Sequence, residues 1–100
     1  MTVKLIMTWD IHPGKEQEYF EFVVRNFMPH IKDLGLGLSD AWVTIYGDHP
    51  QIMVGVVLPS FKTARQVIGS EEWLSLNDKL QDYVDNYSFK LVPLRGAFQF

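Results

Sequence analysis

Two segments of the chain are apolar at nearly every position. Residues 41–46 read AWVTIY, and residues 52–58 read IMVGVVL. Both have the length and the β-branched and aromatic content of strands. A strand whose sheet has helices on one face and water on the other should alternate apolar and polar side chains. These two strands have no polar face, so we expect both faces of their sheet to be covered.

The first strand is expected over residues 2–11, where the odd positions are apolar and the even positions are mixed. The apolar face consists of Val3, Leu5, Met7, Trp9 and Ile11. The tripeptide His12-Pro13-Gly14 should end this strand, because proline cannot continue a ladder and glycine frees the backbone to turn.

A helix is predicted over residues 15–34, with Pro29 producing a kink or break because it cannot bond to the carbonyl of Arg25. Its buried stripe, read at helical spacing, would consist of Phe20, Val23, Val24, Phe27, Ile31 and Leu34. Gly35 and Gly37 should end the helix.

The second half of the chain predicts a hairpin, two helical segments and a last strand. Strands at 38–46 and 51–58 flank the short polar turn at 47–50. Ser60 and Ser70 are suited to cap the two helical segments. The buried stripe of the second segment would consist of Trp73, Leu76, Leu80, Tyr83, Val84 and Tyr87. The last strand is expected from residue 88 to residue 100, with an interruption at Pro93.

This order of elements is two βαβ units that share a central hairpin. It predicts one α+β domain over residues 1–100 with a ferredoxin-like βαββαβ fold. Right-handed crossovers give an antiparallel four-stranded sheet in the order four, one, three, two, with both helical regions on one face. A second copy of the chain is the simplest cover for the other apolar face, so we expect a homodimer.

Composition excludes several classes of function. The formal net charge is −3, and the nine lysines and arginines are scattered, so neither nucleic acid nor an anionic membrane is an expected partner. The chain has no cysteine, which rules out disulfides and thiolate metal sites. No apolar run approaches the ~20 residues of a membrane span, and no signal-peptide pattern is found. A cytoplasmic protein is the expectation.

Two short motifs and the order of elements carry a resemblance to a known superfamily. With Pro13-Gly14-Lys15 before the first helix and Ser70-Glu71-Glu72-Trp73 opening the late helix, the chain resembles the dimeric α+β barrel superfamily. That group includes antibiotic-biosynthesis monooxygenase-like and NIPSNAP-like domains. The resemblance implies dimerisation through the sheets and a small hydrophobic ligand held between helices and sheet.

The haem-degrading branch of that superfamily has a pattern that this chain lacks. The branch uses an Asn on strand one, a Trp before the Ser that opens the late helix, and a His about one turn into that helix. Here strand one has no Asn, Gly69 precedes Ser70, and Asn77 stands near the position of the histidine. An amide cannot serve as an axial imidazole ligand. Haem degradation is therefore disfavoured, and no cofactor is expected.

The predicted ligand pocket lies between helices and sheet. Its lining would consist of Phe20, Phe27, Trp73 and Tyr83, with Asn77 or a tyrosine hydroxyl orienting a carbonyl or phenol. The alternative is that the aromatic residues are core and that Asn77 bonds water at the edge of the stripe.

The three histidines carry weaker signals. His12 and His49 lie near Asp10 and Asp48 at strand ends, but each precedes a proline in a turn, and no metal is assigned to this rim. His30, near the end of its helix, is interpreted as structural through its interaction with the helix dipole.

Two functions remain open at this point. The first is a cofactor-independent monooxygenase-like or isomerase-like enzyme that acts on a small hydrophobic or aromatic molecule. The alternative is a non-enzymatic dimeric ligand-binding or accessory module with a packed interior. An apolar cavity of at least ~300 Å³ beside Asn77 would favour the enzyme.

Overall fold

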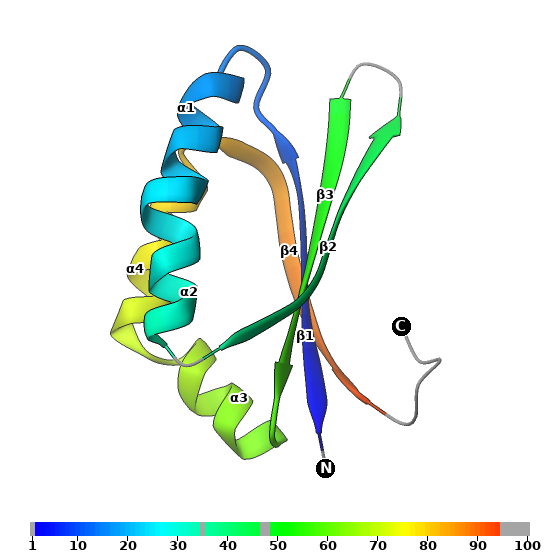
Figure 1. The fold of residues 1–100 in the computed structure, drawn as a ribbon, viewed down its shortest axis with the longest axis vertical. Coiled ribbons are helices and arrows are strands. Elements are labelled where there is room, and N and C mark those ends of the chain that lie inside the picture. The colour runs from blue at the N-terminus through cyan, green and yellow to red at the C-terminus, as the bar shows by residue number, and fades with distance from the viewer. Residues whose placement is uncertain (1, 35, 47–48, 95–100) are drawn as a thin grey trace.

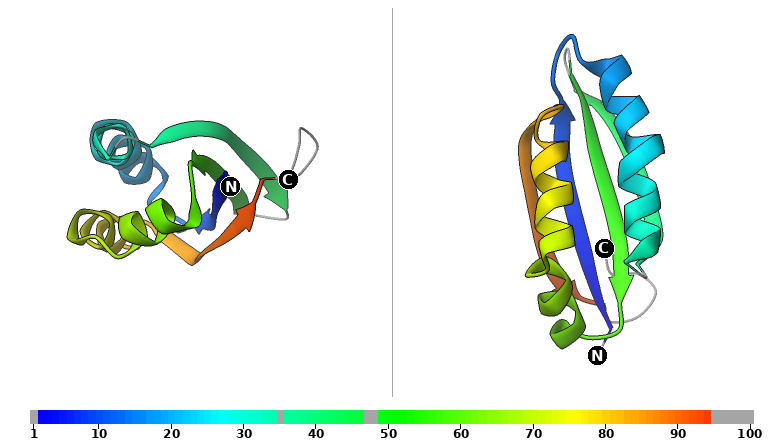
Figure 2. Two further views of the ribbon diagram at one scale, coloured as in Figure 1. Left: turned by 90° about the horizontal axis from the view of Figure 1, so that it is seen from below. Right: turned by 90° about the vertical axis from the view of Figure 1, so that its left-hand side faces the viewer.

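The computed structural model describes residues 2–34, 36–46 and 49–94, with side chains described except at 37–46 and 49–51. The elements are β1 (Val3–Ile11), α1 (Glu16–Phe22), the π-helical turn η1 (Val23–Phe27), α2 (Met28–Asp33), β2 (Gly37–Tyr46), β3 (His49–Leu58), α3 (Phe61–Ile68), α4 (Glu71–Leu80) and β4 (Val84–Pro93). The strands form one antiparallel sheet in the order β2-β3-β1-β4. All helices lie on one face of this curved sheet (Figure 1 and Figure 2). The α+β fold and the expected strand order are confirmed.

The core lies between the helices and the inner face of the two central strands. The odd residues of β1 are at most 4% exposed, as their alternation predicts. The buried residues of β3 pair with these β1 residues, and they are Ile52, Val54, Val56 and Leu58. Burial of this continuous apolar layer holds the helices against the sheet.

The outer face of the sheet combines apolar and polar side chains. Ile6 is buried opposite Gly55, and Met53 is 37% exposed opposite Thr8. The hydroxyls of Thr8 and Ser88 lie 2.9 Å apart and share a hydrogen bond. The predicted apolar faces of residues 41–46 fall outside the described side chains. Among the described side chains this face is therefore less uniformly apolar than the sequence predicted.

The long first helical region contains one extra residue in its middle. The backbone N–H of Met28 donates to the carbonyl of Val23, which is the i→i+5 bond of a π-turn. Pro29, which has no N–H, then falls in the first turn of α2, where proline is tolerated. The interruption predicted at this proline is therefore present, in the form of the π-turn that precedes it.

The extra residue shifts the helix phase, so the predicted stripe is wrong at Phe20 and Val24, whereas Val23 is partly buried against the core. Tyr19 and Phe22 are buried, whereas Phe20 is 54% exposed and Val24 is 68% exposed. A regular α-helix that is counted back from Phe27 with 3.6 residues per turn places Phe20 and Val24 on the buried side. This count fails because it leaves out the inserted residue. Phe20 therefore lies on the outside of the helix.

The late helix also ends earlier than its apolar stripe predicts. α4 stops at Leu80, and Val84 and Tyr87 belong to β4, which begins at Val84 instead of 88. Acidic residues follow Leu80 at Asp82 and Asp85, and negative charge is unfavourable at a helix C-terminus. The chain turns there, and the N–H of Tyr83 donates to the carbonyl of Leu80 at 2.9 Å.

The serine caps are present as predicted. The hydroxyl of Ser70 accepts from the N–H of Trp73 at 3.3 Å, and that of Ser60 accepts from the N–H of Thr63 at 3.1 Å. These bonds satisfy N–H groups that the first turn of each helix leaves unpaired.

The π-turn predicts an asymmetric response to changes in helix length. Deletion of the exposed Val24 removes the inserted residue and should leave Tyr19 and Phe22 on the inner face. Urea unfolding should then show a stability loss below about 1 kcal/mol. Insertion of an alanine after Val24 rotates those two aromatic residues away from the core and should cost about 3 kcal/mol or more. Equal losses for the two variants would contradict the π-turn.

Candidate functional site

The five residues predicted to line a pocket differ widely in burial. Phe27 and Trp73 are almost fully buried, and Phe20 is exposed. Tyr83 is half-buried and stacks on Phe22, with ring centroids 5.1 Å apart. None of the three cavities described below is lined by Phe27, Trp73 or Asn77. Phe27 and Trp73 are core residues.

Asn77 is buried and is hydrogen-bonded by the protein itself. Its side-chain amide donates to the backbone carbonyl of Trp73 at 2.8 Å. Its carbonyl oxygen accepts from the hydroxyl of Tyr87 on β4. A buried amide needs such partners, and here the neighbouring strand supplies what the sequence suggested a ligand could supply. Asn77 is therefore a buried residue with protein partners and does not face solvent at the edge of the stripe.

Trp9 lies at the centre of the aromatic cluster next to Asn77. Its ring is stacked on that of Tyr87 at 6.1 Å and meets Phe27 edge-on at 5.8 Å. Its indole N–H donates to the hydroxyl of Tyr19 at 3.0 Å. Burial raises the pKa of Tyr87 to about 12. Burial also raises the pKa of Tyr19, against the opposing effect of the Trp9 hydrogen bond.

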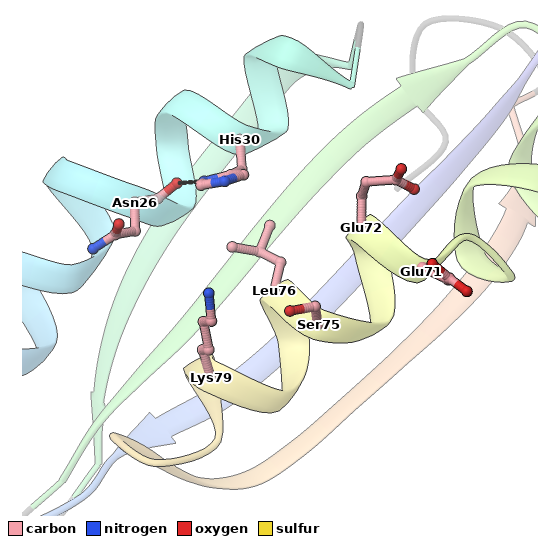
Figure 3. Close-up of a pocket in the computed structure, with 7 residues that line it drawn as sticks. All are labelled: Asn26, His30, Glu71, Glu72, Ser75, Leu76 and Lys79. Atoms are coloured by element: carbon pink, nitrogen blue, oxygen red, sulfur yellow. Dashed lines mark hydrogen bonds between the residues drawn. The ribbon is translucent and has the colours of Figure 1, made fainter.

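A groove of about 330 Å³ runs along the outer side of the helical layer, between the η1–α2 region and α4 (Figure 3). η1 and α2 contribute Asn26 and His30, and α4 contributes Glu71, Glu72, Ser75, Leu76 and Lys79. Leu76 is 3% exposed and is the apolar floor, whereas the other residues that line the groove are exposed and polar. A small organic molecule fits a cavity of this size and mixed lining.

The ring of His30 is fixed beside this groove. Its Nδ1 lies 2.7 Å from the carbonyl oxygen of Asn26. A carbonyl only accepts, so Nδ1 carries the hydrogen, and in the neutral ring Nε2 is left with the lone pair. The role through the helix dipole stays a prediction for His30, and its ring also lines the groove. The ring can accept a hydrogen bond from a bound molecule.

The sequence pattern missed the groove because its two walls come from distant segments. Glu72, Leu76 and Lys79 are spaced at i, i+4 and i+7, which places them on one side of α4. This spacing in the sequence indicates that the three residues share one side of the helix. No local pattern indicates that Asn26 and His30 lie opposite that side.

Two smaller cavities lie elsewhere. One of about 200 Å³ is on the outer face of the sheet and is bounded by Ile6, Thr8, Met53, Ser88, Phe89 and Lys90. Another of about 250 Å³ is bounded by Glu18, Glu21, Phe22, Arg25, Asn26 and Tyr83.

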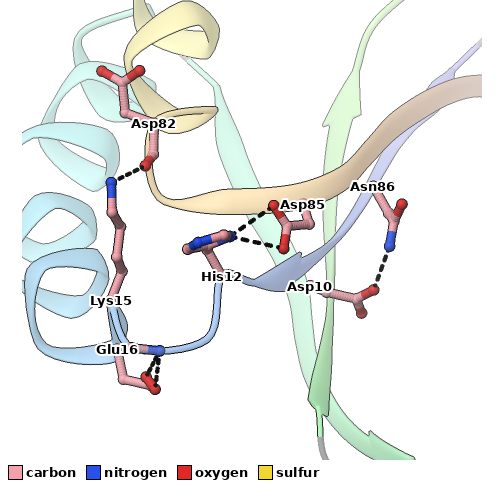
Figure 4. Close-up of polar contacts among 8 residues, drawn as sticks. Asp10, His12, Lys15, Glu16, Asp82, Asp85 and Asn86 are labelled. Atoms are coloured by element: carbon pink, nitrogen blue, oxygen red, sulfur yellow. Dashed lines mark hydrogen bonds and ion pairs between the residues drawn. The ribbon is translucent and has the colours of Figure 1, made fainter.

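The polar side chains at the end of β1 are hydrogen-bonded in separate pairs (Figure 4). The Nδ1 of His12 lies 3.0 Å from both carboxylate oxygens of Asp85. Asp10 accepts from the side-chain amide of Asn86 at 3.0 Å, and Asn86 has a positive φ of 56°. Asp48 and the side chain of His49 lie outside the described residues. Within the described part of the chain, no group of three metal-ligating side chains is found.

Comparison with known proteins identifies the fold. No family model and no curated protein sequence matches the chain. A NIPSNAP family protein of Agrobacterium tumefaciens matches with a TM-score of 0.70 and 18% identity, over 98% of this chain and 96% of that chain. SnoaB of Streptomyces nogalater, a cofactor-independent oxygenase, matches with a TM-score of 0.68 and 12% identity, over 97% and 96%.

A Bacillus halodurans protein of the ethyl tert-butyl ether d family matches with a TM-score of 0.69 and 19% identity, over 95% of this chain and all of that one. The chain therefore shares the fold of these NIPSNAP and oxygenase structures, which is the fold that its motifs suggested. Among the described residues, no helix is long and apolar enough to cross a membrane.

The bond between Tyr87 and Asn77 predicts the consequence of Tyr87→Phe. The change leaves the buried carbonyl of Asn77 without a donor and should cost about 1–3 kcal/mol at pH 7 in urea unfolding. Tyr83→Phe is the matched control, because its ring packing is kept and no bond of its hydroxyl is found in the described region. Equal stability of the two variants would contradict the assigned bond.

The raised pKa of Tyr87 gives an independent prediction at alkaline pH. A tyrosine whose folded pKa exceeds its unfolded value of about 10 contributes stability that is complete below pH 10. That stability is lost as the pH rises toward about 12. Ultraviolet titration of the folded protein should show a tyrosine near 12 that is missing in Tyr87→Phe. An unchanged titration curve in the variant would contradict this assignment.

Proposed function

We propose that the chain is a homodimeric protein that binds a small organic molecule in the groove between the η1–α2 region and α4. The observation that carries this proposal is the fixed ring of His30 beside a cavity of about 330 Å³. The Asn26 carbonyl sets the tautomer and orientation of the ring in advance. A ligand therefore meets an ordered acceptor above an apolar floor at Leu76.

Binding in the groove is favoured over binding under the helices because the described residues around Asn77 and Trp9 already contact one another. Asn77 has protein partners for both its amide and its carbonyl. The aromatic ring of Trp9 contacts those of Phe27 and Tyr87. A ligand entering there would have to break a buried hydrogen bond and separate stacked rings, which costs free energy before any contact is made.

The homodimer would form through the outer face of the sheet. Met53 and Val57 supply apolar surface there, and proteins with this fold are typically dimeric. The Thr8–Ser88 bond and Lys90 add polar groups to the same face. A sheet-to-sheet contact would cover these apolar residues from water.

A second candidate is a cofactor-independent oxygenase that acts on an aromatic molecule. The cluster of Trp9, Tyr19, Tyr87 and Asn77 favours it, because it places hydroxyl and amide groups among aromatic rings. Such groups could polarise a phenol or ketone if the helices moved away from the sheet. In that case, oxygen uptake with electron-rich phenols should be lost in Asn77→Ala.

Fragment binding observed by amide NMR separates the two sites. We expect small polar fragments to shift the amide signals of Asn26, His30 and Lys79 and to leave those of Trp9 and Asn77 unchanged. Ser75→Trp should block the groove and reduce these shifts about tenfold, because an indole takes the space of the ligand. Asp78→Trp, on α4 but not in the lining, is the control. Shifts confined to Trp9 and Asn77 would instead support the oxygenase.

The dimer is tested with a charge on the outer face of the sheet. Sedimentation at micromolar concentration should show a dimer for the unaltered chain and a monomer for Met53→Asp, because an unpaired carboxylate would be buried in the contact. Leu74→Asp places the same charge at an exposed site on the helical side and should remain dimeric. A monomeric unaltered chain would overturn the proposed dimer.

A further inference from the structure

We infer that the groove selects a short zwitterion whose ammonium and carboxylate groups are separated by a chain of methylene groups. This inference rests on the proposed function of the groove and adds the class of its ligand. It follows from the arrangement of charge along α4, from the apolar floor between the charges, and from the fixed imidazole opposite.

Opposite charges stand at the two ends of the groove. Lys79 extends from the C-terminal end of α4 toward the helix that carries Asn26, and Glu72 extends from the other end of α4 (Figure 3). Glu71, at the same end as Glu72, adds a second carboxylate. Within the described part of the chain, none of these three side chains has an ion pair or hydrogen bond.

The sequence of α4 keeps these charges apart. Lys79 would meet a carboxylate on its own helix at position 75 or 76, and those positions are Ser75 and Leu76. Glu72 and Lys79 are seven positions apart, which is about 10 Å along the helix axis. The helix dipole favours acids at the first turn and a lysine at the last, and it leaves both kinds of charge available to a ligand.

The space between the charges suits an apolar chain. Leu76 lies midway and presents its side chain as the floor of the groove. A ligand with only a carboxylate would be attracted by Lys79 but repelled by the two glutamates. A ligand with only an ammonium group would be attracted by the glutamates but repelled by Lys79. A zwitterion can interact favourably with both ends and can lay its methylene groups on Leu76.

The wall across from α4 adds a polar contact near the middle. The Nε2 of a neutral His30 can accept a hydrogen bond, and the hydroxyl of Ser75 can donate or accept one. The size of the groove, about 330 Å³, limits the ligand to a small molecule. An ω-amino acid with both charges at its ends has the required chemistry.

Three matched probes test the inference by isothermal titration calorimetry: 6-aminohexanoate, hexanoate and hexylamine. We expect 6-aminohexanoate to bind at least about tenfold more tightly than either probe that has one charge. Lys79→Gln should weaken 6-aminohexanoate and hexanoate about fivefold and spare hexylamine. Glu72→Gln should weaken 6-aminohexanoate and hexylamine to a similar extent and spare hexanoate.

Two control variants remove the same charges outside the groove. Lys62→Gln and Asp78→Asn should leave the affinities for all three probes unchanged, which separates local contacts from net charge. Equal binding of the three probes, or equal effects of groove and control variants, would overturn the inference. If neutral fragments shift the groove amides and 6-aminohexanoate does not bind, the inference fails and the proposed function stands. If no molecule shifts those amides, both fail.

Discussion

The packing around Trp9 is the contact on which the rest of the structure depends. This one side chain on β1 is bonded to Tyr19 on α1, meets Phe27 on η1 and is stacked on Tyr87 of β4. It therefore joins the sheet to the first helical region and to the edge strand at the same point. Tyr87 in turn is bonded to Asn77, which connects α4 to the same cluster. A buried ring of this size must be in contact with other side chains on all sides, and side chains from the helices provide these contacts.

The π-turn η1 follows from the same packing. It allows Tyr19 and Phe22 to face inward on one side of the turn while Phe27 and Ile31 face inward on the other. It also includes Asn26, whose carbonyl accepts the hydrogen bond from His30. The groove thus depends on a local departure from regular helix, and π-turns of this kind are frequent at functional sites.

The sequence predicts those parts of the fold in which period and burial agree. The alternation on β1 identifies the inner face, because the sheet has one covered side and a period of two. The caps at Ser60 and Ser70 are local, and they too are predictable. A regular helical period misplaces Phe20, because the inserted residue of the π-turn has no signature of its own in the sequence. The same period assigns Tyr87 to the late helix, because Tyr87 follows Trp73 and Leu80 at intervals of seven residues.

The candidate site was less predictable than the fold, for a physical reason. Asn77 draws attention because a polar residue lies in an apolar stripe, yet its partner Tyr87 comes from another element. His30 and Lys79 line the same groove only because α2 and α4, which are distant in the sequence, lie side by side on the sheet (Figure 2). Contacts of this kind arise from tertiary packing, and neither residue carries a local pattern that distinguishes it from a solvated surface residue.

The central claim is that the ligand site lies on the outside of the helical layer and that the interior beneath it is closed. A high-resolution crystal structure of the protein grown with a mixture of small polar fragments tests this claim most directly. The account predicts fragment density beside His30, Leu76 and Lys79, with the Tyr87–Asn77 hydrogen bond intact. Density between the helices and the sheet beside Asn77, with that bond broken and the groove empty, would contradict it.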